Sequence, residues 1–398
     1  MKSWWHFVIG NKRLLNFGFL YNLFSSFGQT FFVSLFVPIW VASFDITNAA
    51  FGSIYATVTI VAAFLLSLTG KYIDKISLVR FSLIVFIGLI ISVILLSQAY
   101  NLVFLVGGLL LVRWLGQGMM THTSATGIAK YFTKNRGKAL GFTALGNPIG
   151  QLVLPLLVIP LIALVGWRSS LLYVAAAAII IVIPSLWALK PVTNFSLELE
   201  ESKNESSNSK ENYLLNSKFW IIAFNSFVIP FLCTALFLYQ YTIGNNFGWE
   251  TSWIAFSFAF YAIFYAVSLI LSGNLVDHFS GIKLFPLYLI PTILALIVMA
   301  LTNNKYIFPV FYALLGVSAG LGNTIRTAVQ VEIYGKKNLG KIRSYFSTLV
   351  VVSTALGPPI FGFFIDRNYS FNAIMLGAAV FVILITLISF RVKNNDNK

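Results

Sequence analysis

Two arginines, Arg113 and Arg326, lie inside long apolar stretches of the 398-residue chain. A charge in an apolar membrane segment is costly, so such a side chain usually has a partner or a function. Polar residues at helical spacing share a helix face with each arginine: Gln117, Thr121 and Ser124 with Arg113, and Asn323 and Gln330 with Arg326. A guanidinium with hydrogen-bonding neighbours on one face can bind a carboxylate or another small anion.

Further polar side chains in apolar stretches are candidates for contact with a solute: Asn22, Ser26 and Gln29 in one stretch, Tyr261, Tyr265, Ser268 and Ser272 in another, and His122 in a third. An imidazole titrates in the physiological range, so His122 is either a proton carrier or a packing residue satisfied by a neighbour. Arg113 could equally be structural, and Arg326 a gate or snorkelling residue. The 12 Asp and Glu lie in loops or at the ends of apolar stretches, which favours an anionic or neutral ligand over a cation.

The composition of the chain excludes most soluble functions. Hydrophobic residues make up 58% and charged residues only 10%, against about 25% charged residues in an average soluble domain. A soluble enzyme, a nucleic-acid binder or a secreted module of this size could not cover its surface with so few charges. The single cysteine and three scattered histidines predict neither an internal disulfide nor a metal site.

Twelve apolar stretches are long enough to cross a bilayer as helices, since a span needs about 20 residues. They lie near 15–40, 50–70, 80–99, 103–127, 139–163, 168–188, 218–242, 252–273, 284–302, 306–330, 343–365 and 371–390. Small residues in several of them predict close helix contacts, because a missing side chain lets backbones approach. These residues are Gly146, Gly150, Gly316, Gly320, Gly357 and Gly362.

The uneven distribution of Lys and Arg between alternate loops predicts the orientation of the chain. With the N-terminus placed in the cytoplasm, 22 of the 27 Lys and Arg fall on the cytoplasmic side, and 3 fall on the outer side: Arg168, Lys305 and Arg367. We therefore predict a multi-pass protein of the plasma (inner) membrane with both termini cytoplasmic. The net charge of +15 then reflects topology and contact with anionic lipid headgroups, not nucleic-acid binding.

An internal repeat divides the chain into two similar halves. Two motifs recur at the same offset of 203 residues: Gly70-Lys-Tyr-Ile-Asp74 with Gly273-Asn-Leu-Val-Asp277, and Tyr131–Lys138 with Tyr334–Lys341. We predict an all-α integral membrane protein with twelve transmembrane helices in two six-helix bundles, 1–189 and 218–398, related as a parallel repeat. Residues 190–217, rich in Ser, Asn and Glu, are predicted to form a cytoplasmic linker between them.

These motifs resemble those of the major facilitator superfamily of transporters. The two Gly-x-x-x-Asp loops are similar to its signature loop, and Arg113-Trp-Leu-Gly-Gln-Gly118 is similar to its fourth-helix motif. The stretch Ala129–Gly141 resembles the turn between the fourth and fifth helices of the monocarboxylate and oxalate/formate type of facilitators. The resemblance covers essentially the whole chain. It implies alternating access of rocker type and a central cavity lined by the first, fourth, seventh and tenth helices.

The resemblance also implies a cytoplasmic gate made by Gly70, Asp74, Gly273, Asp277, Arg136, Lys138 and Arg343. A carboxylate at a helix end can accept hydrogen bonds from the free N–H groups that begin a neighbouring helix. In this gate Asp74 would pair with the start of the eleventh helix near Arg343, and Asp277 with the start of the fifth helix near Arg136 and Lys138. The alternative is that each Asp is a solvated loop charge.

The chain has no nucleotide-binding loop, zinc pattern or Ser-His-Asp arrangement, so we expect neither an enzyme nor an ATP-driven pump, and no cofactor. The favoured function is a secondary active transporter of a small organic anion such as a monocarboxylate, with a proton as a candidate symported ion. One alternative is an exporter of amphipathic compounds with an aromatic-lined pocket. The other is a non-transporting sensor or a membrane-embedded enzyme on the same scaffold. The expected partners are the small-molecule substrate, membrane lipids and protons, and the expected state is a monomer.

Overall fold

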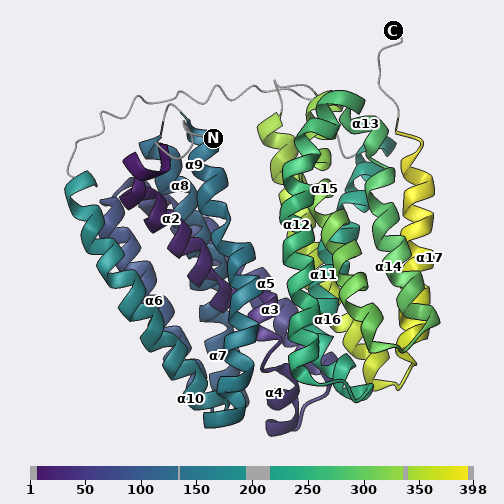
Figure 1. The fold of residues 1–398 in the computed structure, drawn as a ribbon, viewed down its shortest axis with the longest axis horizontal. Helices are drawn as coiled ribbons and strands as arrows, with labels where there is room; N and C mark the ends of the chain where they lie inside the picture. The colour runs from purple at the N-terminus through teal and green to yellow at the C-terminus, as the bar shows by residue number, and fades with distance from the viewer. Residues whose placement is uncertain (1–6, 133–134, 194–215, 335–338, 393–398) are drawn as a thin grey trace. The chain divides into compact units, whose positions relative to one another are not determined.

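The computed structural model describes residues 7–132, 135–193, 216–334 and 339–392, and every regular element among them is helical (Figure 1). The chain divides by its contacts into two units. Unit 1 contains Met1–Asp45 and Thr57–Glu200, and unit 2 contains Ile46–Ala56 and Glu201–Lys398. Residues 46–56, which the sequence repeat assigns to the first bundle, thus cluster with the second. Most of the predicted linker, 194–215, lies outside the described residues.

The first predicted span, near 15–40, is not a single helix. It consists of α2 (Lys12–Phe24), the 3-10 turn η1 (Ser25–Gly28), α3 (Thr30–Val33) and α4 (Val37–Ser43). Gln29 interrupts the run because its backbone is extended, with φ −81° and ψ 152°. The prediction of a single helix over 15–40 was therefore wrong. The break places the backbone of Gly28 against the backbone of residues 112–117, as described below.

Unit 1 continues through long apolar helices. They are α5 (Asn48–Thr69, shared with unit 2), the 3-10 turn η2 (Gly70–Asp74), α6 (Leu78–Ser97), α7 (Leu102–Val112), the π-helical segment η3 (Arg113–Met120), α8 (Thr121–Tyr131), α9 (Arg136–Ala144) and α10 (Gly146–Thr193). The run from α7 to α8 is one candidate span, Leu102–Tyr131. The run α9–α10 covers the fifth and sixth predicted spans, and Gly166 separates them with a φ of +76°, which L side chains rarely adopt.

Unit 2 is built from a second set of helices. They are α11 (Ser217–Asn246), α12 (Thr251–Phe279), α13 (Gly281–Leu284), the turn η5 (Leu287–Leu289), α14 (Ile290–Leu301), the turn η6 (Lys305–Ile307), α15 (Phe308–Tyr334), α16 (Leu339–Asp366) and α17 (Phe371–Ser389). Figure 1 shows α12 and α15 side by side in this unit. Their backbones touch, since a Cβ added to Gly316 would lie 2.5 Å from the carbonyl oxygen of Tyr261.

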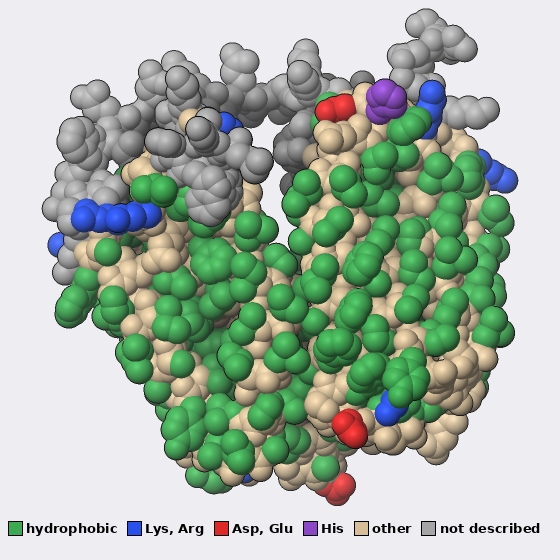
Figure 2. Space-filling model, viewed as in Figure 1, with side chains coloured by type: hydrophobic (Ala, Val, Ile, Leu, Met, Phe, Trp, Pro, Cys, Tyr) green, Lys and Arg blue, Asp and Glu red, His purple; other side chains and the backbone are tan. Residues whose placement is uncertain are grey.

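Ten helical runs among the described residues are long and apolar enough to cross a membrane. They correspond to the twelve predicted spans because the broken first span falls below the length limit and the fifth and sixth are joined in Arg136–Leu189. Figure 2 shows hydrophobic side chains over the flanks of the helices and the coloured charges near helix ends. This is the pattern of a protein whose helices face hydrocarbon.

The close helix contacts predicted from small residues are confirmed within each unit. In unit 1 a Cβ on Gly146 would lie 2.7 Å from the backbone nitrogen of Leu23, so α10 packs directly on α2. In unit 2 a Cβ on Gly320 would lie 2.5 Å from the carbonyl oxygen of Tyr265. Both contacts join backbone to backbone, so a larger side chain cannot be accommodated by rotating a neighbour.

Candidate functional site

Arg113 lies in the interior of unit 1, at the start of the π-helical segment, and is only 3% exposed. Its Nη1 donates to the carbonyl oxygen of Gly28, and its Nη2 to Oγ1 of Thr59, each at 3.0 Å. Both acceptors belong to its own unit. The cost of burying the guanidinium is therefore offset by fixed internal partners, as buried charges require.

The turn that supplies the Gly28 carbonyl fits closely against η3. A Cβ on Gly116 would lie 2.9 Å from the backbone nitrogen of Gly28, and a Cβ on Gly28 would collide with the carbonyl oxygen of Val112 and the nitrogen of Gln117. Only glycine allows the two backbones to approach this far. A π-helical segment, which is frequent at functional sites, thus presents Arg113 to a turn that exists because Gln29 breaks the first span.

The polar residues predicted beside Arg113 are tied to one another within unit 1. Nδ2 of Asn22 donates to the Ser124 hydroxyl at 2.7 Å and to the Gly18 carbonyl at 3.1 Å, and the Ser124 hydroxyl itself donates to the Gly18 carbonyl at 2.8 Å. Gln29 and Gln117 are both partly exposed. This half of the candidate site is a set of internal hydrogen bonds between α2 and the helix of Arg113.

His122 connects the same helix to the predicted gate loop. Its Nε2 lies 3.1 Å from the carbonyl oxygen of Gly70, the first residue of η2. A carbonyl oxygen only accepts, so the proton of this bond is on Nε2. Because a Cβ on Gly70 would come within 3.2 Å of that nitrogen, the glycine gives the ring its access. The structure therefore brings together two residues that the sequence assigned to different roles.

The gate loop is also held by Lys130 of α8. Its Nζ forms an ion pair with Asp74 at 2.5 Å and donates to the carbonyl oxygen of Ile73 at 3.2 Å. The Asp74 side chain is 63% exposed, so the pair is well solvated. Sequence reasoning did not include Lys130 in the gate, although a basic side chain in the last turn of the helix was visible in the sequence.

Arg326 of α15 has different surroundings in unit 2. Its Nε donates to the Gly322 carbonyl at 2.8 Å and its Nη1 to the Ser226 carbonyl at 3.1 Å, and the side chain is partly exposed. Within the described residues its Nη2 has no hydrogen-bond partner. The helices α11, α12 up to Val276 and α15 up to Val331 carry no Asp or Glu to neutralise it.

Aromatic and polar side chains surround this arginine. Tyr261 and Tyr265 stack with ring centroids 5.9 Å apart, and the Tyr265 hydroxyl lies 3.5 Å from Nδ2 of Asn323. Tyr261 also packs against Phe237 of α11, with ring centroids 4.7 Å apart. One guanidinium, one amide and two tyrosine rings thus lie together in unit 2, on α12 and α15, and α11 supplies the Ser226 carbonyl that bonds the guanidinium.

The remaining predicted gate residues are distributed as follows. Gly273 and Asp277 lie inside α12, which runs on to Phe279, so the second loop does not copy the 3-10 turn of the first. Asp277, Arg136 and Lys138 are exposed, and the side chain of Arg343 lies outside the described residues. A carboxylate that the prediction passed over, Glu332, accepts from the backbone nitrogens of Gly281 and Ile282 at 2.6 and 3.0 Å.

Sequence reasoning also missed two fully buried polar pairs in unit 2. The Tyr288 hydroxyl donates to Oδ1 of Asn225 at 2.6 Å, and the Tyr312 hydroxyl donates to Oε1 of Gln240 at 2.9 Å. Polar residues at helical spacing in the predicted seventh span could have signalled them. No group of three or more His, Cys, Asp or Glu able to hold a metal occurs among the described residues.

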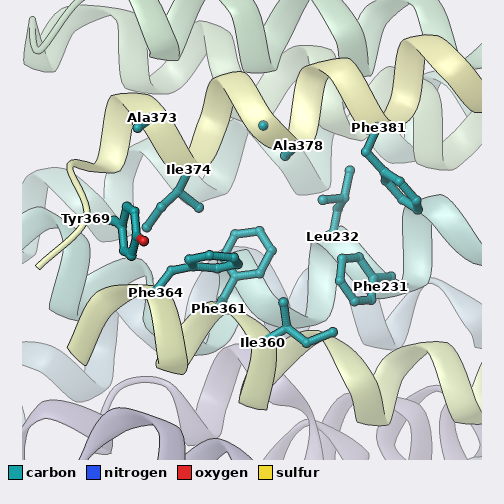
Figure 3. A pocket seen from close by; sticks show the side chains of 11 residues that line it. Phe231, Leu232, Ile360, Phe361, Phe364, Tyr369, Ala373, Ile374, Ala378 and Phe381 are labelled. Atoms are coloured by element: carbon teal, nitrogen blue, oxygen red, sulfur yellow. The ribbon is translucent and has the colours of Figure 1, made fainter. Parts of the chain in front are cut away.

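An apolar cavity of about 470 Å³ lies apart from these residues, between α11, α16 and α17. Figure 3 shows side chains of all three helices around it, with the only oxygen in view on Tyr369. Its aromatic lining residues are Phe231, Phe361, Phe364, Tyr369 and Phe381. Ile360 and Phe381 are more than a third exposed, so the cavity opens at the surface of the helices.

The family model of the Major Facilitator Superfamily matches residues 18–260 and 233–398. The chain therefore belongs to the Major Facilitator Superfamily. It is a multi-pass integral membrane protein of this family of transporters. The superfamily predicted from the loop motifs is confirmed by this match.

Individual relatives are distant. The chain is 24% identical over 246 residues to a Staphylococcus haemolyticus protein named "Probable nitrate transporter NarT"; the match covers 59% of this chain and 62% of the relative's length. Three solved structures share the fold over at least 95% of both chains. Two are a bacterial homologue of the human lysosomal transporter Spinster, inward-facing, in occupied (TM-score 0.73, 17% identity) and unoccupied (0.74, 15%) conformations. The third is a variant of the nucleoside transporter NupG (0.72, 13%).

Proposed function

We propose that the transported solute is a small organic anion such as a monocarboxylate and that Arg326 is the residue that binds its charge. The observation that carries this proposal is the surroundings of Arg326: a partly exposed guanidinium, held by two carbonyls along one edge, with Nη2 left without a partner among the described residues. No carboxylate of the surrounding helices neutralises it. A guanidinium fixed in this way is preorganised for a planar oxyanion.

The neighbouring side chains supply the rest of such a site. Asn323 is exposed beside Tyr265, so its amide and the tyrosine hydroxyl can donate to the second oxygen of a carboxylate. The stacked rings of Tyr261 and Tyr265 offer an apolar wall to a short carbon chain. Arg113 then has a structural role, since its two terminal nitrogens already bond Gly28 and Thr59.

The similarity to a protein named as a probable nitrate transporter supports a small oxyanion as the solute. Nitrate, which the name of the Staphylococcus haemolyticus protein gives as its solute, is a planar monoanion with the same oxygen spacing as a carboxylate. The resemblance of Ala129–Gly141 to monocarboxylate and oxalate/formate facilitators points to the same class of solute. Nitrate therefore belongs among the tested ligands with formate, lactate and oxalate.

We further propose that transport follows alternating access of rocker type, with both termini in the cytoplasm of a plasma membrane and a proton as the coupled ion. The 22 to 3 distribution of Lys and Arg supports the orientation. His122 is the candidate for proton transfer because its ring binds the Gly70 carbonyl of the gate loop. The pairing of Asp74 with the helix start near Arg343, and of Asp277 with that near Arg136 and Lys138, remains part of this proposal.

Thermal unfolding of the purified protein tests the anion site. A ligand at about 100 times its Kd stabilises the folded state by about 2.7 kcal/mol, so a carboxylate or nitrate that binds raises Tm measurably. We expect the shift to disappear in Arg326→Gln and to persist in the matched control Arg367→Gln, because Arg367 is exposed at the far end of unit 2 over the Phe363 ring. An undiminished shift in Arg326→Gln would contradict the assignment.

The aromatic cavity of Figure 3 favours one other function, export of amphipathic compounds. Its lining is apolar apart from the Tyr369 hydroxyl, which suits a hydrophobic ligand with a polar group at one end. In the same thermal assay, stabilisation by amphipathic cations alone, abolished by Phe361→Ala and retained in Arg326→Gln, would favour the exporter over the anion transporter.

A further inference from the structure

The last residue of α16, Asp366, binds the first turn of α5 with both carboxylate oxygens. Oδ1 accepts from the backbone nitrogen and from Nδ2 of Asn48, each at 2.9 Å, and Oδ2 accepts from the backbone nitrogen of Ala49 at 2.7 Å. Such N–H groups have no partner inside their own helix. The carboxylate therefore caps α5 from a position more than 300 residues away in the sequence, and its charge complements the helix dipole.

Close backbone contacts continue this junction for one more turn. A Cβ on Gly52 would lie 2.6 Å from the carbonyl oxygen of Pro358, and a Cβ on Gly362 would lie 2.6 Å from the carbonyl oxygen of Asn48. The Tyr239 hydroxyl of α11 donates to that same Asn48 oxygen at 2.6 Å. The start of α5 is thus seated on α16 and α11 by hydrogen bonds and by two glycines.

The helix that is held in this way belongs to both units. Residues 46–56 cluster with unit 2, and from Thr57 onward the same helix clusters with unit 1. α5 runs from Asn48 to Thr69 without interruption. Any motion of the units must therefore bend α5 or separate its first turns from α16.

We propose that Asp366, Asn48 and Ala49 form a releasable latch, and that its opening is a step of the transport cycle. The inference rests on the alternating access proposed above. Hydrogen bonds from N–H groups to a carboxylate suit such a role because water can replace each of them when the surfaces part. A contact made by interlocked apolar side chains would have to expose hydrocarbon to open.

The latch exists only once in the repeat. The residue 203 positions before Asp366 is Ala163, and the residue 203 positions after Asn48 is Thr251. The side chain of an alanine has no oxygen that could accept from a helix start, so a second copy of this carboxylate cap cannot form. The latch is thus a feature of this chain's own residues and not a consequence of the repeated fold.

Cysteine labelling tests whether the carboxylate holds the segment. Phe51 and Tyr55 are fully buried in the first turns of α5, so Phe51→Cys and Tyr55→Cys are two independent reporters for a water-soluble maleimide. Adding Asp366→Asn should raise the labelling rate of both about tenfold, as expected for the loss of charge-assisted hydrogen bonds. The control is Asp45→Asn, the same change at an exposed residue whose φ of +48° asparagine tolerates. Unchanged rates with Asp366→Asn in both reporters would overturn the latch.

A reversible cross-link tests whether the latch must open. Thr47 and Arg367 are exposed neighbours of Asn48 and Asp366, so Thr47→Cys with Arg367→Cys can be bridged by a short bifunctional methanethiosulfonate while Asp366, Asn48 and Ala49 are unchanged. Because the Thr47 hydroxyl accepts from the Ala50 nitrogen of the same helix start, the unbridged double variant is the reference for uptake. The bridged protein should keep its ligand-induced Tm shift, lose more than about tenfold in uptake into proteoliposomes, and recover with dithiothreitol, while both single variants are unaffected.

The two proposals fail in different ways. Unimpaired uptake by the bridged protein would show that the contact is static and would overturn the latch while leaving the anion transporter intact. If the unmodified protein neither binds nor moves any tested anion, the proposed substrate class fails, and the labelling rates still decide whether Asp366 holds the start of α5.

Discussion

The two arginines in apolar helices have opposite surroundings. Arg113 in unit 1 is 3% exposed, and its guanidinium bonds the Gly28 carbonyl and the Thr59 hydroxyl. Arg326 in unit 2 is partly exposed, and two carbonyls hold one edge of its guanidinium while Nη2 has no partner among the described residues. The same residue type thus has fixed internal partners in one unit and, in the other, a partly exposed guanidinium with one nitrogen unbonded among the described residues.

This difference has a local cause. In unit 1 the extended Gln29 ends the first helical run and brings the Gly28 carbonyl to Arg113. In unit 2 the corresponding first helix, α11, is unbroken from Ser217 to Asn246 despite Pro230. The unbroken α11 supplies a helical carbonyl, that of Ser226, to Nη1 of Arg326, whereas the broken first run of unit 1 supplies the turn carbonyl of Gly28 to Arg113.

The most damaging change to this arrangement should be Gly28→Ala. The new methyl group would collide with backbone atoms of Val112 and Gln117, which no rotamer change can relieve. We expect loss of folded protein, measured as the fraction that elutes as a monodisperse peak in detergent. The control is Gly107→Ala in α7, where nothing lies within 4 Å and the change should be neutral or stabilising. Normal yields of both variants would contradict the close fit of η1 on η3.

The next largest effect separates the two arginines directly. Arg113→Ala removes the donor to the buried Gly28 carbonyl and the bond to Thr59, and we expect it to cost about 3 kcal/mol of stability. Arg326→Ala should cost little stability and weaken anion binding instead, by about 10- to 100-fold, as for the loss of a charged hydrogen-bond partner. Tm without ligand and Kd from ligand titration give the two readouts. The contrast between the two arginines would be wrong if both variants lost the same property, whether thermal stability or anion affinity.

Much of the fold was predictable because membrane spans depend on composition and length alone. The twelve stretches, the repeat and the superfamily follow from apolar runs and from the Gly-x-x-x-Asp loops. The break at Gln29 was not predicted, because the polar residues around it, Ser25, Ser26 and Thr30, also suit one face of a continuous helix and no proline marks the position itself. A tertiary contact, the approach of Gly28 to Gly116, decides the local conformation there.

The sequence predicted which residue types would line the candidate site, but not which atoms they would bond. Helical spacing placed Asn22 and Ser124 on inward faces of their helices, and they do bond each other. The capture of Arg113 by a backbone carbonyl and the cap of α5 by Asp366 could not be predicted, because both depend on main-chain atoms distant in the sequence. Backbone acceptors and donors carry no signal in the residue pattern, so the sequence predicted neither the partners of Arg113 nor the role of Asp366.

The smallest expected effects concern the loops that carry the repeated aspartates. In unit 1 Lys130 reaches the loop as a solvated ion pair with Asp74, which is 63% exposed, and such pairs contribute well under about 1 kcal/mol. In unit 2 Glu332 caps α13 through the backbone nitrogens of Gly281 and Ile282. A carboxylate bound to two such N–H groups is worth about 1 kcal/mol even near the surface.

Glu332→Gln should therefore loosen its loop more than Lys130→Met loosens the other. Amide hydrogen exchange of Gly281 and Ile282 should accelerate about fivefold in Glu332→Gln, which corresponds to about 1 kcal/mol of local opening free energy. The amides of 70–75 should change by less than about twofold in Lys130→Met, since solvent screens that pair. If the order is reversed, the ion pair is the stronger anchor, and the loop of unit 1 is fixed by charge rather than by the His122 contact with the Gly70 carbonyl.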